Sequence, residues 1–104
     1  MIYGVDSDAI VTPEAVRDAM CECFYQAHCQ TLELDNADEA ASREYCTDMI
    51  KKAFRDTGGD FNQPTKKSIV NVMYKLAEIS KSFRKPEIIK KHMGEMMQLV
   101  NKLN

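Results

Sequence analysis

The chain has 104 residues, of which 44% are hydrophobic and 29% are charged, and its net charge is −2 at pH 7. This length and composition predict one globular domain over residues 1–104 that folds without a disulfide framework or a cofactor. No apolar run is long enough to span a membrane and no secretory signal opens the chain, so we expect a cytoplasmic protein with reduced cysteines.

The chain begins with an irregular segment, residues 1–11, in which two short apolar runs flank a polar, turn-forming sequence. We expect this segment to form an extended arm on a helical domain. Thr12 and Pro13 are typical of a helix start, because threonine caps the first turn and proline needs no backbone N–H there. The apolar spacing that follows predicts a helix of about residues 12–34.

This first predicted helix carries two apolar stripes. The broader stripe suits a core, and the second lies about 120–140° round the helix. The second stripe consists of Cys21, Tyr25, His28 and Leu32. Two such faces indicate that the helix either is central in the fold or meets another chain.

Three further helices are predicted, of about residues 37–57, 65–83 and 86–103. Each has apolar residues at steps of three and four between capping residues, glycine or proline. The last is apolar over about 180° of its circumference, and Met93 and Met97 belong to this excess. The expected fold is all-α, a four-helix antiparallel up-down bundle with an irregular N-terminal arm.

Cysteine and histidine are the first residues to consider for chemistry. No two of them stand three or four residues apart, so their spacing matches no zinc site within one helix. Cys23 and Cys46 come level if the first two helices form a hairpin, and could then touch as buried thiols or form a bridge. A thiol or metal site built from these two and neighbouring Cys and His residues is therefore an alternative. The sequence itself predicts no metal, cofactor or catalytic residue.

Charge is divided unevenly along the chain. Residues 1–61 carry thirteen acidic and five basic side chains, whereas residues 62–104 carry three acidic and nine basic ones. Two such halves neutralise each other when they fold together, which is the interpretation we favour. The alternative is an anion or nucleic-acid site at the corner between the third and fourth helices. Its basic residues are Lys81, Arg84, Lys85, Lys90 and Lys91.

These patterns predict a small cytosolic protein–protein interaction module that associates with itself or with a protein partner and has no catalysis of its own. Methionine and tyrosine suit contact surfaces, and the chain has more apolar helix surface than four packed helices need. No membrane partner is expected. The predicted interface consists of Cys21, Tyr25, His28, Leu32, Met93 and Met97.

Overall fold

The computed structural model describes residues 2–6, 10–32, 39–82 and 85–103. Over this part of the chain the structure is all-α, as the sequence predicts, with four helices and no strand. The helices are α1 (Pro13–Leu32), α2 (Glu39–Asp56), α3 (Lys66–Ser80) and α4 (Pro86–Val100). Each lies within its predicted range, and the predicted ends at 33–34, 37–38 and 83 fall outside the described residues.

The helices begin where the sequence supplies a cap. Thr12 Oγ1 accepts a hydrogen bond from the backbone N–H of Ala15 at 3.1 Å. At the start of α3, Thr65 and Ser68 form a reciprocal capping box. These bonds satisfy backbone donors that the first helical turn leaves without partners. In α4 the first position is Pro86, which has no such donor.

The arm contains a tight turn at residues 2–5. The backbone N–H groups of Ile2 and Val5 donate to each other's carbonyl oxygens at 3.0 and 2.9 Å. Tyr3 and Gly4 between them have φ of 50° and 84°, as the two central residues of such a hairpin turn require. Glycine adopts this conformation at low cost and tyrosine does not, so the Tyr3 side chain is held in place at some expense of backbone energy.

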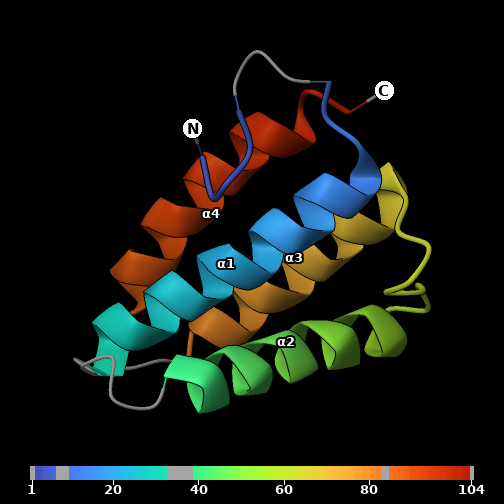
Figure 1. The fold of residues 1–104 in the computed structure, drawn as a ribbon. Coiled ribbons are helices and arrows are strands. Elements are labelled where there is room, and N and C mark those ends of the chain that lie inside the picture. Colours follow the sequence, from blue (N-terminus) through green and yellow to red (C-terminus); the bar gives the residue numbers. More distant parts are fainter. Residues whose placement is uncertain (1, 7–9, 33–38, 83–84, 104) are drawn as a thin grey trace.

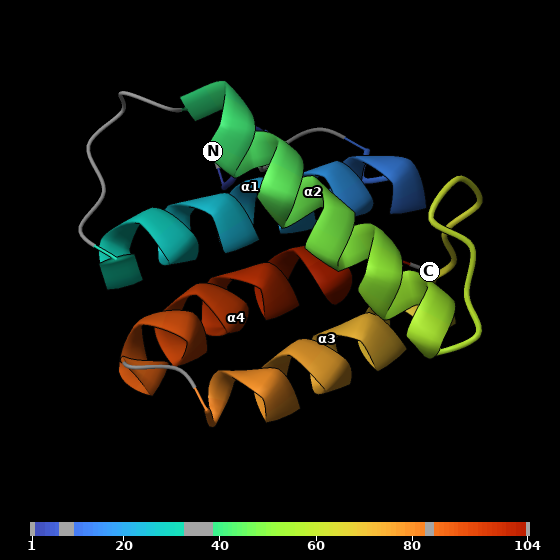
Figure 2. The ribbon, with the colours of Figure 1, turned by 90° about the horizontal axis from the view of Figure 1, so that it is seen from below.

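The central helix is α1, which contacts α2, α3 and α4. Figure 2 shows α3 and α4 side by side, with α2 crossing over α1 and α3. Residues 3–5 of the arm lie over α1 and α4 (Figure 1). Both apolar faces of α1 are therefore used inside the chain, which agrees with the central position that its two stripes allow.

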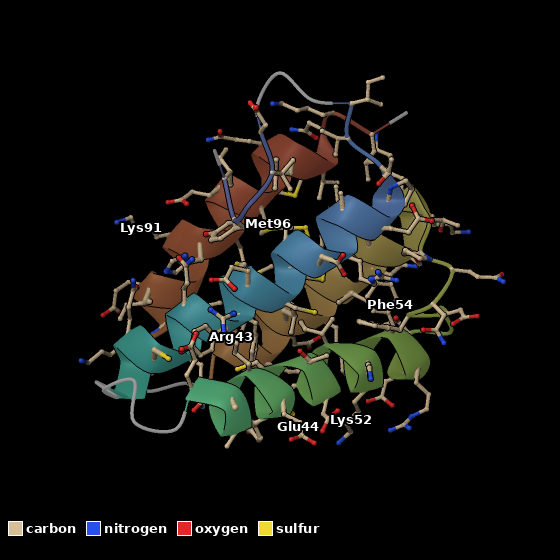
Figure 3. The ribbon with its side chains drawn as sticks, in the orientation of Figure 1. Arg43, Glu44, Lys52, Phe54, Lys91 and Met96 are labelled. Atoms are coloured by element: carbon tan, nitrogen blue, oxygen red, sulfur yellow. The ribbon has the colours of Figure 1, made fainter. Side chains whose placement is uncertain are left out.

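The core lies between the four helices. Its largest fully buried side chains come from every helix, and are Val16, Met20, Cys46, Ile50, Phe54, Ile69, Val72, Met96, Leu99 and Val100. In Figure 3, Phe54 and Met96 point into the bundle, whereas Glu44, Lys52 and Lys91 point away from it. The apolar periodicity of each helix thus places one face in the core.

Candidate interaction surface

Tyr25, from the second stripe of α1, is covered by α2. Its side chain is only 7% exposed, and the guanidinium carbon of Arg43 lies 4.0 Å from the centre of its ring. A cation over an aromatic face is attracted by the ring's negative face. Tyr25 therefore contacts its own chain rather than solvent.

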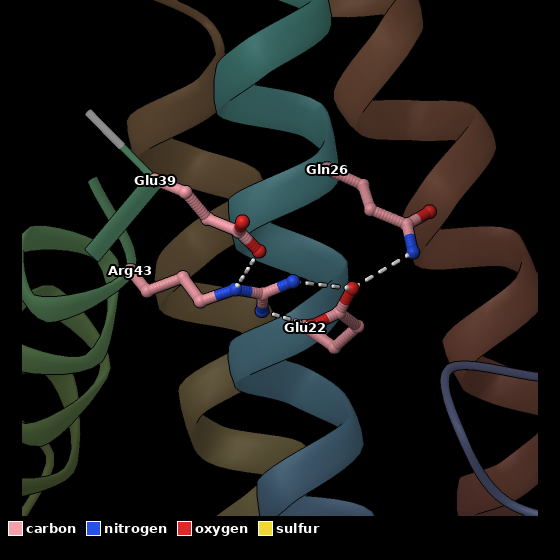
Figure 4. A network of polar contacts seen from close by, with 4 residues as sticks. All are labelled: Glu22, Gln26, Glu39 and Arg43. Atoms are coloured by element: carbon pink, nitrogen blue, oxygen red, sulfur yellow. Dashed lines mark hydrogen bonds and ion pairs between the residues drawn. The ribbon is translucent and has the colours of Figure 1, made fainter. Parts of the chain in front are cut away.

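Arg43 lies over the Tyr25 ring and is held there by a polar network. Figure 4 shows the members of this network, Glu22, Gln26, Glu39 and Arg43. Arg43 Nε donates to Glu39 Oε1 at 2.9 Å, and its other nitrogens form an ion pair with Glu22 of α1. Gln26 Nε2 donates to Glu22 Oε1 at 3.2 Å. The hydrogen bond from Arg43 holds the pKa of the Glu22 carboxyl below its usual range, against the effect of burial. The network fastens the start of α2 to the middle of α1.

Cys21 and His28, the other described side chains of this stripe, also lie on the α2 side of α1. Burial raises the pKa of the half-buried Cys21 thiol to about 11. The ring of half-buried His28 lies 5.3 Å from that of Tyr45. Leu32 ends α1, and its side chain lies outside the described part of the structure. Tyr45 on α2, the neighbour of His28, is 52% exposed.

The Met-rich side of α4 opens onto an apolar groove between α3 and α4, with a volume of about 260 Å³. From α3 the lining residues are Val70, Met73, Tyr74 and Ala77, and from α4 they are Met93, Gly94 and Met97. Tyr74 is 72% exposed and Met97 is 40% exposed. We call this the α3–α4 groove.

Helical spacing explains why the α3–α4 groove forms. Val70, Tyr74 and Ala77 recur at steps of four and three, and so share one side of α3 next to its buried face. Met93 and Met97 are four residues apart on the facing side of α4. Sequence reasoning identified the two methionines but missed the α3 side. The signal that would have found it is this second apolar stripe, beside the stripe that enters the core.

The predicted basic corner is described except for Arg84, which lies outside the described residues. Lys81, Lys90 and Lys91 are exposed, and Lys85 is half-buried at the N-cap of α4. Lys81 follows the end of α3 and Lys90 lies in the first turns of α4. These two lysines therefore lie towards one end of the α3–α4 groove.

A series of hydrogen bonds joins Tyr3 of the arm to the bundle. The apolar neighbours of His92 at helical spacing predict a partly buried histidine with a hydrogen-bond partner, but no sequence signal identified the partners. His92 on α4 is 6% exposed, and its Nε2 lies 2.9 Å from Gln30 Oε1, an acceptor, so Nε2 carries the ring proton. The Tyr3 hydroxyl then donates to Nδ1 at 2.6 Å. Burial holds the pKa of His92 below its usual range and raises that of Tyr3. Both groups stay neutral near pH 7, and the hydrogen bond between them holds Tyr3 against α4.

All four cysteines are free thiols. Cys23 lies beside residues of α3 and α4, among them Met73 and Met96. Cys23 and Cys46 both belong to the buried core. Burial raises the pKa of each to about 12, which keeps both protonated and poorly reactive. Among the described residues, no group of three or more His, Cys, Asp or Glu side chains is placed to hold a metal ion.

In the described part of the chain, no helix combines the length and the apolar character that crossing a membrane requires. Comparisons with protein-family models, curated proteins and solved structures found no match to this chain.

Proposed function

We propose that this protein is a helical protein–protein interaction module that binds through the α3–α4 groove and has no catalysis of its own. The observation that carries the proposal is the exposure of Tyr74 and Met97 beside an apolar hollow. Tyrosine and methionine are enriched at protein contacts, and methionine adapts its shape to different partners.

Burial of the exposed groove residues can supply part of the free energy of binding. Covering an exposed apolar side chain contributes about 1.5–3 kcal/mol when burial is complete, so Tyr74 and Met97 could together supply a few kcal/mol before the costs of association. A few well-buried aromatic anchors commonly dominate an interface in this way. Tyr45, the exposed aromatic residue of α2, does not line the α3–α4 groove.

The scaffold suits a binding role. Successive helices alternate in direction in Figure 1, which supports an antiparallel up-down bundle as the detailed arrangement. In such a bundle α3 and α4 are held by the core on one side, so the groove between them is positioned before a partner arrives. A preformed surface loses less conformational entropy on binding than a mobile one.

Self-association and a cytosolic location remain predictions. A second copy would have to cover Met93 and Met97, because Tyr25 is already covered by Arg43. Sedimentation velocity across a range of protein concentrations tests this directly. If the protein stays monomeric at all concentrations, its partner is a different protein and not a second copy.

Site-specific photocrosslinking in the cells that make the protein tests the proposed function. With p-benzoylphenylalanine in place of Tyr74, illumination should join the chain to another protein molecule. The matched control has the same residue in place of Tyr45, which is also an exposed tyrosine but lies on α2. Equal crosslinking at both positions, or none at position 74, would show that the α3–α4 groove is not a docking surface.

A further inference from the structure

Basic side chains flank the α3–α4 groove at both ends. On α3, the side next to the groove follows Lys66, Val70, Met73, Ala77 and Lys81, at steps of four and three. Three apolar residues thus lie between two exposed lysines. Lys66 Nζ donates to the backbone carbonyl of Leu103 at 3.0 Å, which places the start of α3 beside the C-terminal end of the described chain.

The facing side of α4 repeats the pattern, with Lys90, Met93 and Met97 at steps of three and four. Two acidic residues also border the groove: Glu78 lies one turn beyond Tyr74 on α3, and Glu87 is about 20° from Gly94 round α4, at 100° per residue. Exposed lysines outnumber them, because Lys67 is also about 20° from Tyr74 round α3. Among the described residues, the net charge next to the groove is therefore positive.

The shape of the α3–α4 groove suits a helix. Its lining residues run from Val70 to Ala77 on α3, about 10 Å at a rise of 1.5 Å per residue, which is the length of two turns of a docked helix. An amphipathic helix can place side chains spaced i, i+3, i+4 and i+7 in such a groove. A Cβ added at Gly94 would meet nothing within 4 Å, so the space beside this residue is open to an incoming side chain.

On the basis of the proposed function, we propose that the groove binds an amphipathic helix of another protein whose apolar row is flanked by Asp or Glu. The apolar row would lie against Met93, Met97 and Tyr74, and the acids would meet Lys66 at one end and Lys81 and Lys90 at the other. Opposite charges at an interface rim select partners and speed association.

Charge and lining argue against the other occupants. A second copy that used the same face would set two groups of lysines against each other, and such like-charge contacts disfavour a partner. A nucleic acid would find phosphate ligands at the ends of the groove and one ring to stack on, that of Tyr74, but mostly aliphatic and methionine side chains along it, without the successive aromatic platforms or recognition elements of such binders. An acidic helix satisfies both the lysines and the apolar lining.

Selection from a peptide library tests the proposal. The library displays helices of about 15 residues, the length of α3 and α4, with a fixed leucine row and Glu, Lys or Ser at each flanking position. Selection on the purified protein should enrich Glu at both ends of the row. The Lys81→Glu/Lys90→Glu variant should instead enrich Lys at the corresponding end and bind the original peptides about tenfold more weakly.

Fluorescence anisotropy of the selected peptides supplies the controls. Met97→Glu should abolish binding, whereas Tyr45→Glu and Lys52→Glu on α2 should leave it unchanged, and circular dichroism should show that each variant is folded. Enrichment of neutral or basic peptides, failure to select any peptide, or binding that survives Met97→Glu would overturn the proposal. The proposal would also be overturned if no acidic peptide binds and the protein instead forms a dimer, or binds phosphatidylserine vesicles, in a way that Met97→Glu abolishes. If position 74 crosslinks to another protein but the library does not enrich acidic peptides, the acidic partner helix is rejected and the proposed function as an interaction module stands.

Discussion

The hydrogen bond between the arm and α4 makes a sharp prediction for the Tyr3→Phe variant. This change removes one oxygen atom and keeps the aromatic ring. It leaves Nδ1 of His92 without the donor that now lies 2.6 Å away. Because His92 is only 6% exposed, water cannot readily replace that donor. A buried polar atom that loses its partner costs about 1–3 kcal/mol, and Tyr3 is only half-buried, so we expect about 1–2 kcal/mol.

Urea unfolding followed by circular dichroism measures this change. A loss of about 1 kcal/mol should also lower the melting temperature by about 4–8 °C in a domain of this size. Tyr74→Phe is the matched control, because it removes the same atom from a side chain that is 72% exposed, and it should change stability by less than about 0.5 kcal/mol. Equal unfolding midpoints for the two variants would refute the role of the Tyr3–His92 hydrogen bond.

Three further predictions concern His92, Arg43 and the thiols. Burial holds the pKa of His92 below its ordinary value of 6.5, so the unfolded state takes up a proton before the folded state as the pH falls through 6.5. The urea concentration at the unfolding midpoint should therefore be lower at pH 5.5 than at pH 7.5. An equally large decrease in the His92→Gln variant would show that His92 is not the cause. Arg43→Ala should lower the free energy of unfolding by about 1 kcal/mol, because it removes the contact with Tyr25 and the ion pairs. In the same urea assay Lys52→Ala should lower it by less than about 0.5 kcal/mol. Equal losses in the two variants would mean that the Arg43 network does not stabilise the fold. Cys23 and Cys46 should react with a thiol reagent only as fast as the protein opens, and rapid labelling of the native protein would show that burial does not protect them.

Local sequence signals predicted the helices because they act over a few residues. Thr12, Thr65 and Pro86 mark helix starts through bonds, or a missing donor, within the first turn, and the structure has helices at each of these places. The apolar periodicity also identified the core faces. Such signals require no knowledge of how the helices pack.

The contacts that the sequence did not predict join residues far apart in the chain. Arg43 covers Tyr25 from another helix, so spacing within α1 could not show whether α2 or a second molecule lies against that stripe. The bond between Tyr3 and His92 spans 89 positions. Tyr74 was missed for a different reason: it belongs with Val70 and Ala77 to a second apolar stripe of α3, but only the structure shows that Met97 of α4 lines the same hollow.

NMR of methyl-labelled methionines tests the central claim most directly. Met73, Met93 and Met97 line the α3–α4 groove, whereas Met49 lies on α2. On addition of a selected acidic helix, the methyl signals of the three groove methionines should shift and that of Met49 should stay in place. Unchanged groove signals, or shifts as large at Met49, would contradict docking at the α3–α4 groove.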